Sequence, residues 1–415
     1  MKGAAASVLL AAAPNRAFAA SSSADLSLGF DEAYWARIAA QYDVTDKVVQ
    51  LENGNWGIMP RPVLATYQRM VERVNRENSF YARRGMGGDL AAVRERVAGF
   101  LGVDVEEIVF TRNATEALKA LIGGYNRIGP GDAALFADLD YGSMQASLVA
   151  AMKRRGARAI KIALPEPATH DNLIAAYADA LAREPKIRFI LLTHISHRSG
   201  LMIPVREIAD MARARGVDVI VDAAHSLGQV NFTIPDLAAD FVGLNLHKWI
   251  GAPLGVGAAY VRKGRLAAID PDIADEDKAS GAITSRIHTG TVDFAALLTV
   301  PEALSFQERI GGASREARLR ALRDGWVKGV RTNPAIQVLT PEDDRMHGGI
   351  TSFRLAGRTT IEDNVALAAR LLDEFGIFTV HREGLASGAC VRVTPALFNS
   401  MDDVQRLAAA LNEIA

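Results

Sequence analysis

The chain has 415 residues and is 49% hydrophobic, so it is long enough for a large domain, a smaller domain and a buried active site. Its 47 Lys and Arg residues balance 48 Asp and Glu residues, which leaves no long-range field to attract nucleic acid or an anionic membrane. The single cysteine, Cys390, excludes an intrachain disulfide and a cysteine-based zinc or iron–sulfur site, and we predict no bound metal.

Residues 1–20 are predicted to be a removable export signal. Lys2 precedes a mildly apolar run, and Ala17-Phe18-Ala19 gives the small-x-small pattern that a signal peptidase needs. The alternative is an alanine-rich tail or a short helix, because no arginine pair precedes the run. If the true start lies upstream of Met1, a twin-arginine motif could lie there. We therefore expect a periplasmic or exported protein, and a cytoplasmic one if the signal is not real. No later run reaches the ~18 apolar residues of a membrane span.

The middle of the chain predicts a mostly parallel sheet with helices on both faces. Residues 21–90 lack a clean strand pattern and are expected to form an N-terminal arm over the cleft and part of a small domain. Residues 91–300, the expected large domain, alternate apolar β-branched runs with helical patterns. Strands are predicted at 107–110, 133–136, 159–162, 189–192, 217–221, 241–243 and 256–260, with helices near 114–125, 142–154, 171–183 and 204–215. Ligands bind beyond the carboxyl ends of such strands.

Residues 301–415 predict a smaller α+β domain. A long charged helix is expected at 302–326, followed by strands at 349–354 and 389–393 and helices at 361–375 and 401–414.

One predicted strand, 217–221, ends in the carboxylate of Asp222. A carboxylate in so apolar a setting needs a cation or strong donor opposite it, and a protonated pyridine nitrogen is such a partner. The alternative is an aspartate that caps the following helix. His225 follows three residues later and could reach the phenolic oxygen of the same ring, or could simply be a helix-start histidine.

A lysine follows the next strand, in the run Asn245-Leu246-His247-Lys248 before a glycine-rich turn. A lysine whose pKa is lowered by burial and nearby positive charge can attack an aldehyde and form an imine. A lone lysine after a strand is more often a surface residue. The placement of Lys248 26 residues after Asp222 favours the functional interpretation.

The strand at 107–110 leads into Asn113-Ala114-Thr115-Glu116 at a predicted helix start. Backbone N–H groups there, together with the Thr115 hydroxyl, would form a phosphate cradle without a P-loop. A plain helix cap by Asn113 or Thr115 is the alternative.

These residues, taken together, resemble the class V aminotransferases, a group of fold type I pyridoxal-phosphate enzymes, over residues 53–411. The most specific part is Asp-x-x-His followed by His-Lys. The resemblance implies pyridoxal phosphate as cofactor, held as a Schiff base by Lys248 with Asp222 on the pyridine nitrogen and His225 near the phenolic oxygen. It places around the phosphate Ala114, Thr115, Asn245 and His247.

Further matches to the family imply the rest of the site. Tyr141 corresponds to a ring that stacks on the cofactor, although a core tyrosine is an equal alternative. His197 replaces an asparagine near the cofactor and the substrate carboxylate. Gly290 and Thr291 correspond to a pair that reaches the phosphate of a neighbouring subunit, which implies a homodimer. Arg392 matches the arginine fork that clamps the substrate carboxylate.

The reaction is expected to begin with removal of the Cα proton of an amino acid or an amino-acid-containing metabolite. The run Asn53-Gly54-Asn55-Trp56-Gly57 most resembles the isopenicillin N epimerase-like branch, and Asn55 is a substrate-binding candidate. We therefore predict transamination or epimerisation. A C–S lyase or cysteine desulfurase-like enzyme is the alternative. The desulfurase is disfavoured because Cys390 is predicted to lie in a strand, too rigidly held to shuttle sulfur. A non-catalytic cofactor-binding protein is a remote alternative.

Overall fold

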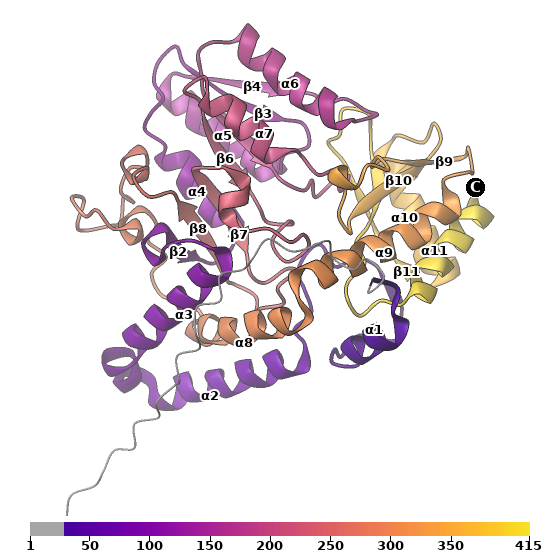
Figure 1. The fold of residues 1–415 in the computed structure, drawn as a ribbon, viewed down its shortest axis with the longest axis horizontal. Coiled ribbons are helices and arrows are strands. Elements are labelled where there is room, and N and C mark those ends of the chain that lie inside the picture. Colours follow the sequence, from indigo (N-terminus) through magenta and orange to yellow (C-terminus); the bar gives the residue numbers. More distant parts are fainter. Residues whose placement is uncertain (1–28) are drawn as a thin grey trace, which may run out of the picture.

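The central sheet has seven strands within the described residues. The structure, a computed structural model, describes residues 29–415 (Figure 1). The strands run in the order β2-β8-β7-β6-β5-β3-β4. Strands β3 to β7 are parallel, and β8 is antiparallel to both of its neighbours. Their bounds are β2 Ile108–Thr111, β3 Ala133–Ala137, β4 Arg158–Ile162, β5 Ile187–Thr193, β6 Asp218–Asp222, β7 Phe241–Asn245 and β8 Gly257–Val261.

Helices cover both faces of this sheet because its strands are apolar on both sides. In β6, Val219 and Val221 belong to one hydrophobic core, whereas Ile220 belongs to the other. This alternation is the two-residue period of a strand, and it leaves both faces needing cover. The covering helices are α4 Ala114–Gly124, α5 Gly142–Arg155, α6 His170–Arg183 and α7 Val205–Arg213. The mostly parallel α/β architecture predicted from the sequence is therefore confirmed.

The segment before the sheet is largely helical. It contains α1 Glu32–Ala39, the short strand β1 Val49–Gln50, α2 Arg61–Arg84 and α3 Met86–Leu101. Strand β1 pairs in parallel with β11 of the C-terminal region, so this segment reaches across to the opposite end of the chain. The sequence pattern predicted an arm here and did not predict these helices.

The expected helix at 302–326 is in fact two helices. Helix α8, Phe294–Ile310, and helix α9, Gly312–Val330, are separated by Gly311, whose φ of 88° no L side chain adopts readily. The C-terminal region that follows contains an antiparallel sheet of order β12-β13-β10-β9. Its elements are β9 Ile336–Val338, β10 Thr351–Leu355, α10 Ile361–Phe375, β11 Ile377–Phe378, β12 Val380–Arg382, β13 Cys390–Val393 and α11 Met401–Ile414.

The predicted export signal, residues 1–20, lies outside the described residues. Within residues 29–415, no helix combines the length and the apolar character that crossing a bilayer requires. The predicted domain boundaries at residues 20, 90 and 300 stay a prediction.

Candidate active site

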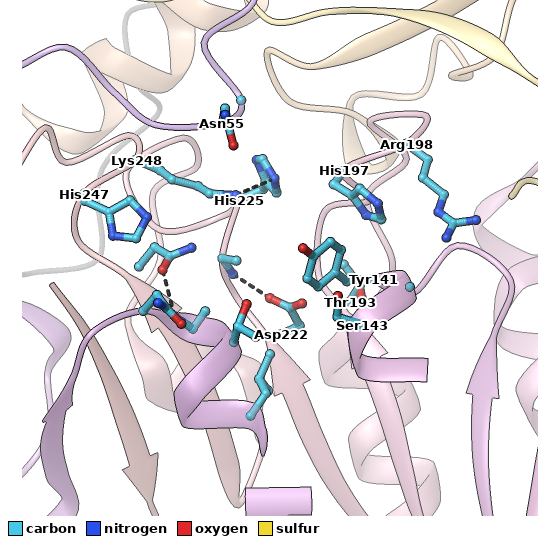
Figure 2. A pocket seen from close by; sticks show the side chains of 18 of the residues that line it. Asn55, Tyr141, Ser143, Thr193, His197, Arg198, Asp222, His225, His247 and Lys248 are labelled. Carbon is cyan, nitrogen blue, oxygen red and sulfur yellow. Dashed lines mark hydrogen bonds between the residues drawn. The ribbon is translucent and has the colours of Figure 1, made fainter. Parts of the chain in front are cut away.

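A cavity of about 690 Å³ lies where the carboxyl ends of the central strands meet the C-terminal sheet. Side chains reach it from the ends of β5, β6 and β7, from the start of α4 and from the segment after β1 (Figure 2). Two further walls come from the start of α5 and from the residues around the end of β12. The strand ends singled out in the sequence therefore converge on one cavity, as expected for an open α/β sheet.

Asp222, the last residue of β6, points its carboxylate into this cavity (Figure 2). The side chain is only 4% exposed, and Oδ1 accepts a hydrogen bond of 2.9 Å from the Ala224 N–H. Burial raises the pKa of Asp222, while the nearby Lys248 acts in the opposite direction. A carboxylate held by one backbone amide in so dry a place is suited to a cationic partner.

Lys248 and His225 form the reactive pair of the cavity. The Lys248 Nζ atom lies 2.9 Å from His225 Nε2 (Figure 2). The pKa of Lys248 is lowered to about 8, chiefly by burial; Asp222 opposes this shift and Arg392 adds to it. Burial also holds the pKa of His225 well below its ordinary value, so its imidazole is neutral. The lysine amine is thus available as a nucleophile and proton carrier near neutral pH.

The start of α4 forms the end of the cavity that could receive a phosphate. Asn245 Oδ1 accepts the Ala114 N–H at 2.7 Å, and Asn113 Oδ1 caps the Glu116 N–H at 2.9 Å. Thr115 lines the cavity between them, at the positive end of the helix. Asn245 therefore orients the helix start by a contact that the sequence could not specify.

His247 lines the same end of the cavity. Its Nδ1 lies 3.0 Å from the Val256 carbonyl, which fixes the ring and leaves Nε2 for a ligand. Burial lowers the pKa of His247.

Tyr141 and His197 form the opposite wall. Their rings meet edge to face with centroids 5.0 Å apart, and Tyr141 is partly exposed at the start of α5. Burial, with the cations Arg198 and Arg392 next in effect, holds the pKa of His197 well below its ordinary value. Asn55 reaches the cavity from the segment after β1 (Figure 2). A planar ligand between this wall and Lys248 would have an aromatic surface to pack on.

Arg392, the predicted carboxylate clamp, is already paired within the chain. Its Nη2 lies 2.6 and 2.8 Å from the two carboxylate oxygens of Glu52, and its Nη1 donates to the His197 carbonyl at 2.6 Å. Gly54 packs so closely that a Cβ there would lie 2.4 Å from Nη2. The guanidinium therefore has its outer nitrogens occupied and is only 1% exposed.

Gly290 and Thr291 do not line the cavity of this chain, and both are exposed. Their predicted contact with the phosphate of a second subunit stays a prediction.

Cys390 is fully buried in β13 and does not line the cavity. Its Sγ donates to the Arg198 carbonyl at 3.7 Å, and burial raises the pKa of this thiol to about 11. A thiol with so high a pKa is protonated at neutral pH and is a poor nucleophile.

Charged residues of the cavity region that the sequence did not single out include Glu52, Arg198, Arg382 and Glu383. Glu52 pairs with Arg392 and lies 3.4 Å from Arg382, so its role depends on a contact across 340 residues of sequence. Arg198 directly follows His197, and this adjacency was the one signal that could have drawn attention to it.

Comparison with known proteins places these features in one family. The sequence pattern of the family described as Aminotransferase class-V matches residues 59–407. Isopenicillin N epimerase from Streptomyces clavuligerus is 27% identical over 396 residues, covering 92% of this chain and 98% of that protein. A putative L-cysteine desulfhydrase 1 from Oryza sativa subsp. japonica is 28% identical, covering 91% of this chain and 86% of that protein.

Solved structures show the same fold. The apo cysteine desulfurase from Thermococcus onnurineus NA1 superposes with a TM-score of 0.76 at 20% identity, covering 91% of this chain and 97% of that one. A C-DES variant with glycine covalently linked to its PLP cofactor also gives a TM-score of 0.76, at 22% identity, with 90% and 98% covered.

The residues of the cavity fit pyridoxal phosphate. The buried amine of Lys248 suits the aldehyde of the cofactor, and the buried carboxylate of Asp222, one strand away, suits its pyridine nitrogen. The helix start at the far end of the cavity suits its phosphate. The orphaned polar atoms include the buried His225 Nδ1 and His197 Nδ1, which have no partner within the described residues. The chain therefore belongs to the class V aminotransferase family and is a pyridoxal-phosphate enzyme of fold type I.

Proposed function

We propose that this enzyme removes and returns the Cα proton of an amino acid or amino-acid-containing metabolite, by epimerisation or transamination. The observation that carries the proposal is the Lys248–His225 contact of 2.9 Å beside the buried Asp222. An amine with a pKa of about 8 is a suitable base and acid near neutral pH, because it is populated in both protonation states.

Each side chain would have a separate task. Bound pyridoxal phosphate supplies an electron sink at the carbon that loses its proton. We assign to Lys248 the covalent attachment of the cofactor and the transfer of the Cα proton. Asp222 would face the pyridine nitrogen and keep it protonated, and His225 would face the phenolic oxygen. Thr115, at the positive end of α4, and His247 would hold the phosphate.

A cysteine desulfurase mechanism is disfavoured by the single thiol. Such an enzyme needs a mobile, ionisable cysteine in the site, whereas Cys390 is buried in a strand with a pKa of about 11. A C–S lyase that releases sulfur without an enzymic thiol is the second candidate, supported by the resemblance to the rice protein named a putative L-cysteine desulfhydrase.

The decisive experiment measures exchange of the Cα proton. A panel of L- and D-amino acids is incubated with the holoenzyme in deuterated water and followed by NMR. Epimerisation predicts deuterium at Cα together with inversion, and transamination predicts conversion to a keto acid and the amine form of the cofactor. Sulfide release from cysteine would favour the lyase. A holoenzyme that exchanges no Cα proton on any member of the panel would refute the proposal.

We further propose a homodimer in which Gly290 and Thr291 of one subunit complete the phosphate site of the other. Both residues are exposed in the single chain, which leaves them free for such a contact. Sedimentation of the holoenzyme tests the dimer, and Thr291→Ala should weaken cofactor retention. A monomeric, fully active holoenzyme would contradict this arrangement.

We retain export as a proposal for residues 1–20. Expression with and without these residues, followed by fractionation of the host cell, tests it. A full-length product that stays in the cytoplasm with residues 1–20 attached would count against an export signal.

A further inference from the structure

One arginine of the cavity wall, Arg198, has no ion-pair partner within the described residues. It is 9% exposed, and its buried Nε has no acceptor. Burial lowers its pKa, because the charged form has lost water without gaining a hydrogen-bonded anion. Removing a charge from water is costly, so an unpaired buried guanidinium calls for an acidic partner.

The carboxylates nearest to Arg198 are committed elsewhere. Asp138 accepts the Leu164 N–H and the Ala386 N–H, both at 3.0 Å. Asp140 accepts the Ala137 N–H at 2.7 Å and the Thr193 N–H at 2.9 Å, and burial raises its pKa to about 7. These two aspartates therefore serve backbone amides, and neither lies within salt-bridge distance of Arg198 in the described part of the chain.

Glu383 is the remaining acid that acts on Arg198, and it is exposed at the edge of the cavity. The guanidinium packs instead against the backbone of Gly384, where a Cβ would lie 1.7 Å from Nη1. This loop and the start of α5 enclose the arginine and leave its side toward the cavity open.

Arg392 is not free to bind a carboxylate of the substrate. Its charge is neutralised by both oxygens of Glu52, so the pair adds no net positive charge to the cavity. His197 lies between Lys248 and Arg198 (Figure 2). Arg198 and Arg392 both lower the pKa of His197. Arg382 lies 3.4 Å from the same Glu52 and shares this one carboxylate, whereas Arg198 has no carboxylate of the described residues within salt-bridge distance and is separated from the reacting amine by His197 (Figure 2).

We propose that Arg198 binds an acidic group of the substrate remote from the reacting carbon. This inference rests on the proposed function, and it specifies the substrate class as an amino acid or related amine that carries a second, distal carboxylate. Two parallel hydrogen bonds from the guanidinium fork would hold that carboxylate and orient the reacting carbon toward Lys248. Arg198 is thus a specificity-determining residue.

The test compares L-glutamate with L-glutamine, which are nearly the same size and differ in distal charge. Dissociation constants are measured on the holoenzyme by titration calorimetry and by the visible spectrum of the bound cofactor. The wild type should bind glutamate about tenfold or more tighter than glutamine, as expected for a charge-assisted hydrogen bond. Arg198→Gln should abolish this preference, and Arg198→Lys should keep part of it.

The matched control is Arg158→Gln, which removes an exposed arginine paired with Glu184 far from the cavity and should leave the preference unchanged. Arg198→Gln should fold with undiminished thermal stability, because it removes an unpaired buried charge. Equal binding of the two amino acids, tighter binding of glutamine, failure of glutamate to bind, or an unchanged preference in Arg198→Gln would overturn the proposal. Failure of the proposed function would appear separately, as absent Cα exchange.

Discussion

Glu52 and Arg392 face each other across the two halves of the chain in a buried, two-oxygen ion pair, with distances of 2.6 and 2.8 Å to the same nitrogen. The Glu52 side chain is only 7% exposed and also accepts from the Thr394 hydroxyl at 3.2 Å. The pair links the segment after β1 to the end of β13. It also places a resident carboxylate where the family resemblance implies a substrate carboxylate.

Glu52→Gln tests this pair. The substitution should lower the free energy of unfolding by about 1–3 kcal/mol, because a buried guanidinium loses its charged acceptor. It should also tighten the binding of acetate to the holoenzyme, since Arg392 then lacks an anion. Denaturant unfolding and acetate titration measure the two effects. Glu184→Gln, which removes the acid of the Arg158–Glu184 pair, should change the free energy of unfolding by less than about 0.5 kcal/mol. Equal losses of stability in the two variants would show that the buried Glu52–Arg392 pair contributes no more than this pair.

The rate of cofactor attachment to the apoenzyme should depend on pH through Lys248. Only the neutral amine attacks an aldehyde, and a pKa lowered to about 8 means that the rate rises with pH and levels off above about pH 9. A lysine of ordinary pKa would give a rate still rising at pH 10. Stopped-flow absorbance between pH 6 and 10 distinguishes the two. Asp222→Asn should move the midpoint downward, because Asp222 contributes more than Glu52 to raising this pKa.

Lys248→Ala should lose covalent attachment of the cofactor and reduce Cα-proton exchange by about 10²–10⁴-fold, the usual contribution of a proton-transferring group. Borohydride reduction followed by peptide mass spectrometry measures the attachment. Wild-type turnover by this variant, or a label on a peptide without residue 248, would refute the assignment.

Asp222→Ala should leave some cofactor bound, because the phosphate end of the cavity is unaffected. Its exchange rate should fall by about 10²–10³-fold, as is common when a preorganised charge is removed from an active site. Cofactor content and Cα-proton exchange are measured on the same sample. An unchanged rate per bound cofactor would contradict the role given to this carboxylate.

Cys390→Ala should keep its Cα chemistry, because the thiol is buried outside the cavity with a raised pKa. Loss of one buried sulfur should cost about 1–2 kcal/mol of stability. The native thiol should react with a disulfide reagent only after unfolding. Rapid modification of the Cys390 thiol in the native protein, accompanied by loss of turnover, would instead favour a desulfurase-like mechanism.

The parts of the fold that were predictable from sequence are those set by local patterns. The apolar runs predicted as strands at 217–221 and 241–243 correspond to β6 and β7, and the helical pattern at 401–414 corresponds to α11 Met401–Ile414. The convergence of Lys248, Asp222 and His225 followed from the rule that parallel strands end at one edge.

The remainder depended on contacts between distant residues. The single break at Gly311 cannot be distinguished by composition from a continuous helix, because glycine is tolerated within helices. The partnership of Asn245 with the Ala114 amide spans 131 residues, and that of Arg392 with Glu52 spans 340. Neither pairing leaves a local pattern in the sequence, so whether Arg392 is free to bind a substrate could not be judged from the sequence.

The hydrogen bonds between Asn53 and Thr394 have a consequence for biosynthesis. The Asn53 N–H donates to the Thr394 hydroxyl at 2.7 Å and its side-chain amide to the Thr394 carbonyl at 2.9 Å, across 341 residues of sequence. A nascent chain on the ribosome cannot make these bonds until its last strand has emerged. The segment around Asn53, whose neighbours Gly54 and Asn55 line the cavity, is therefore fixed in place only after Thr394 has been synthesised.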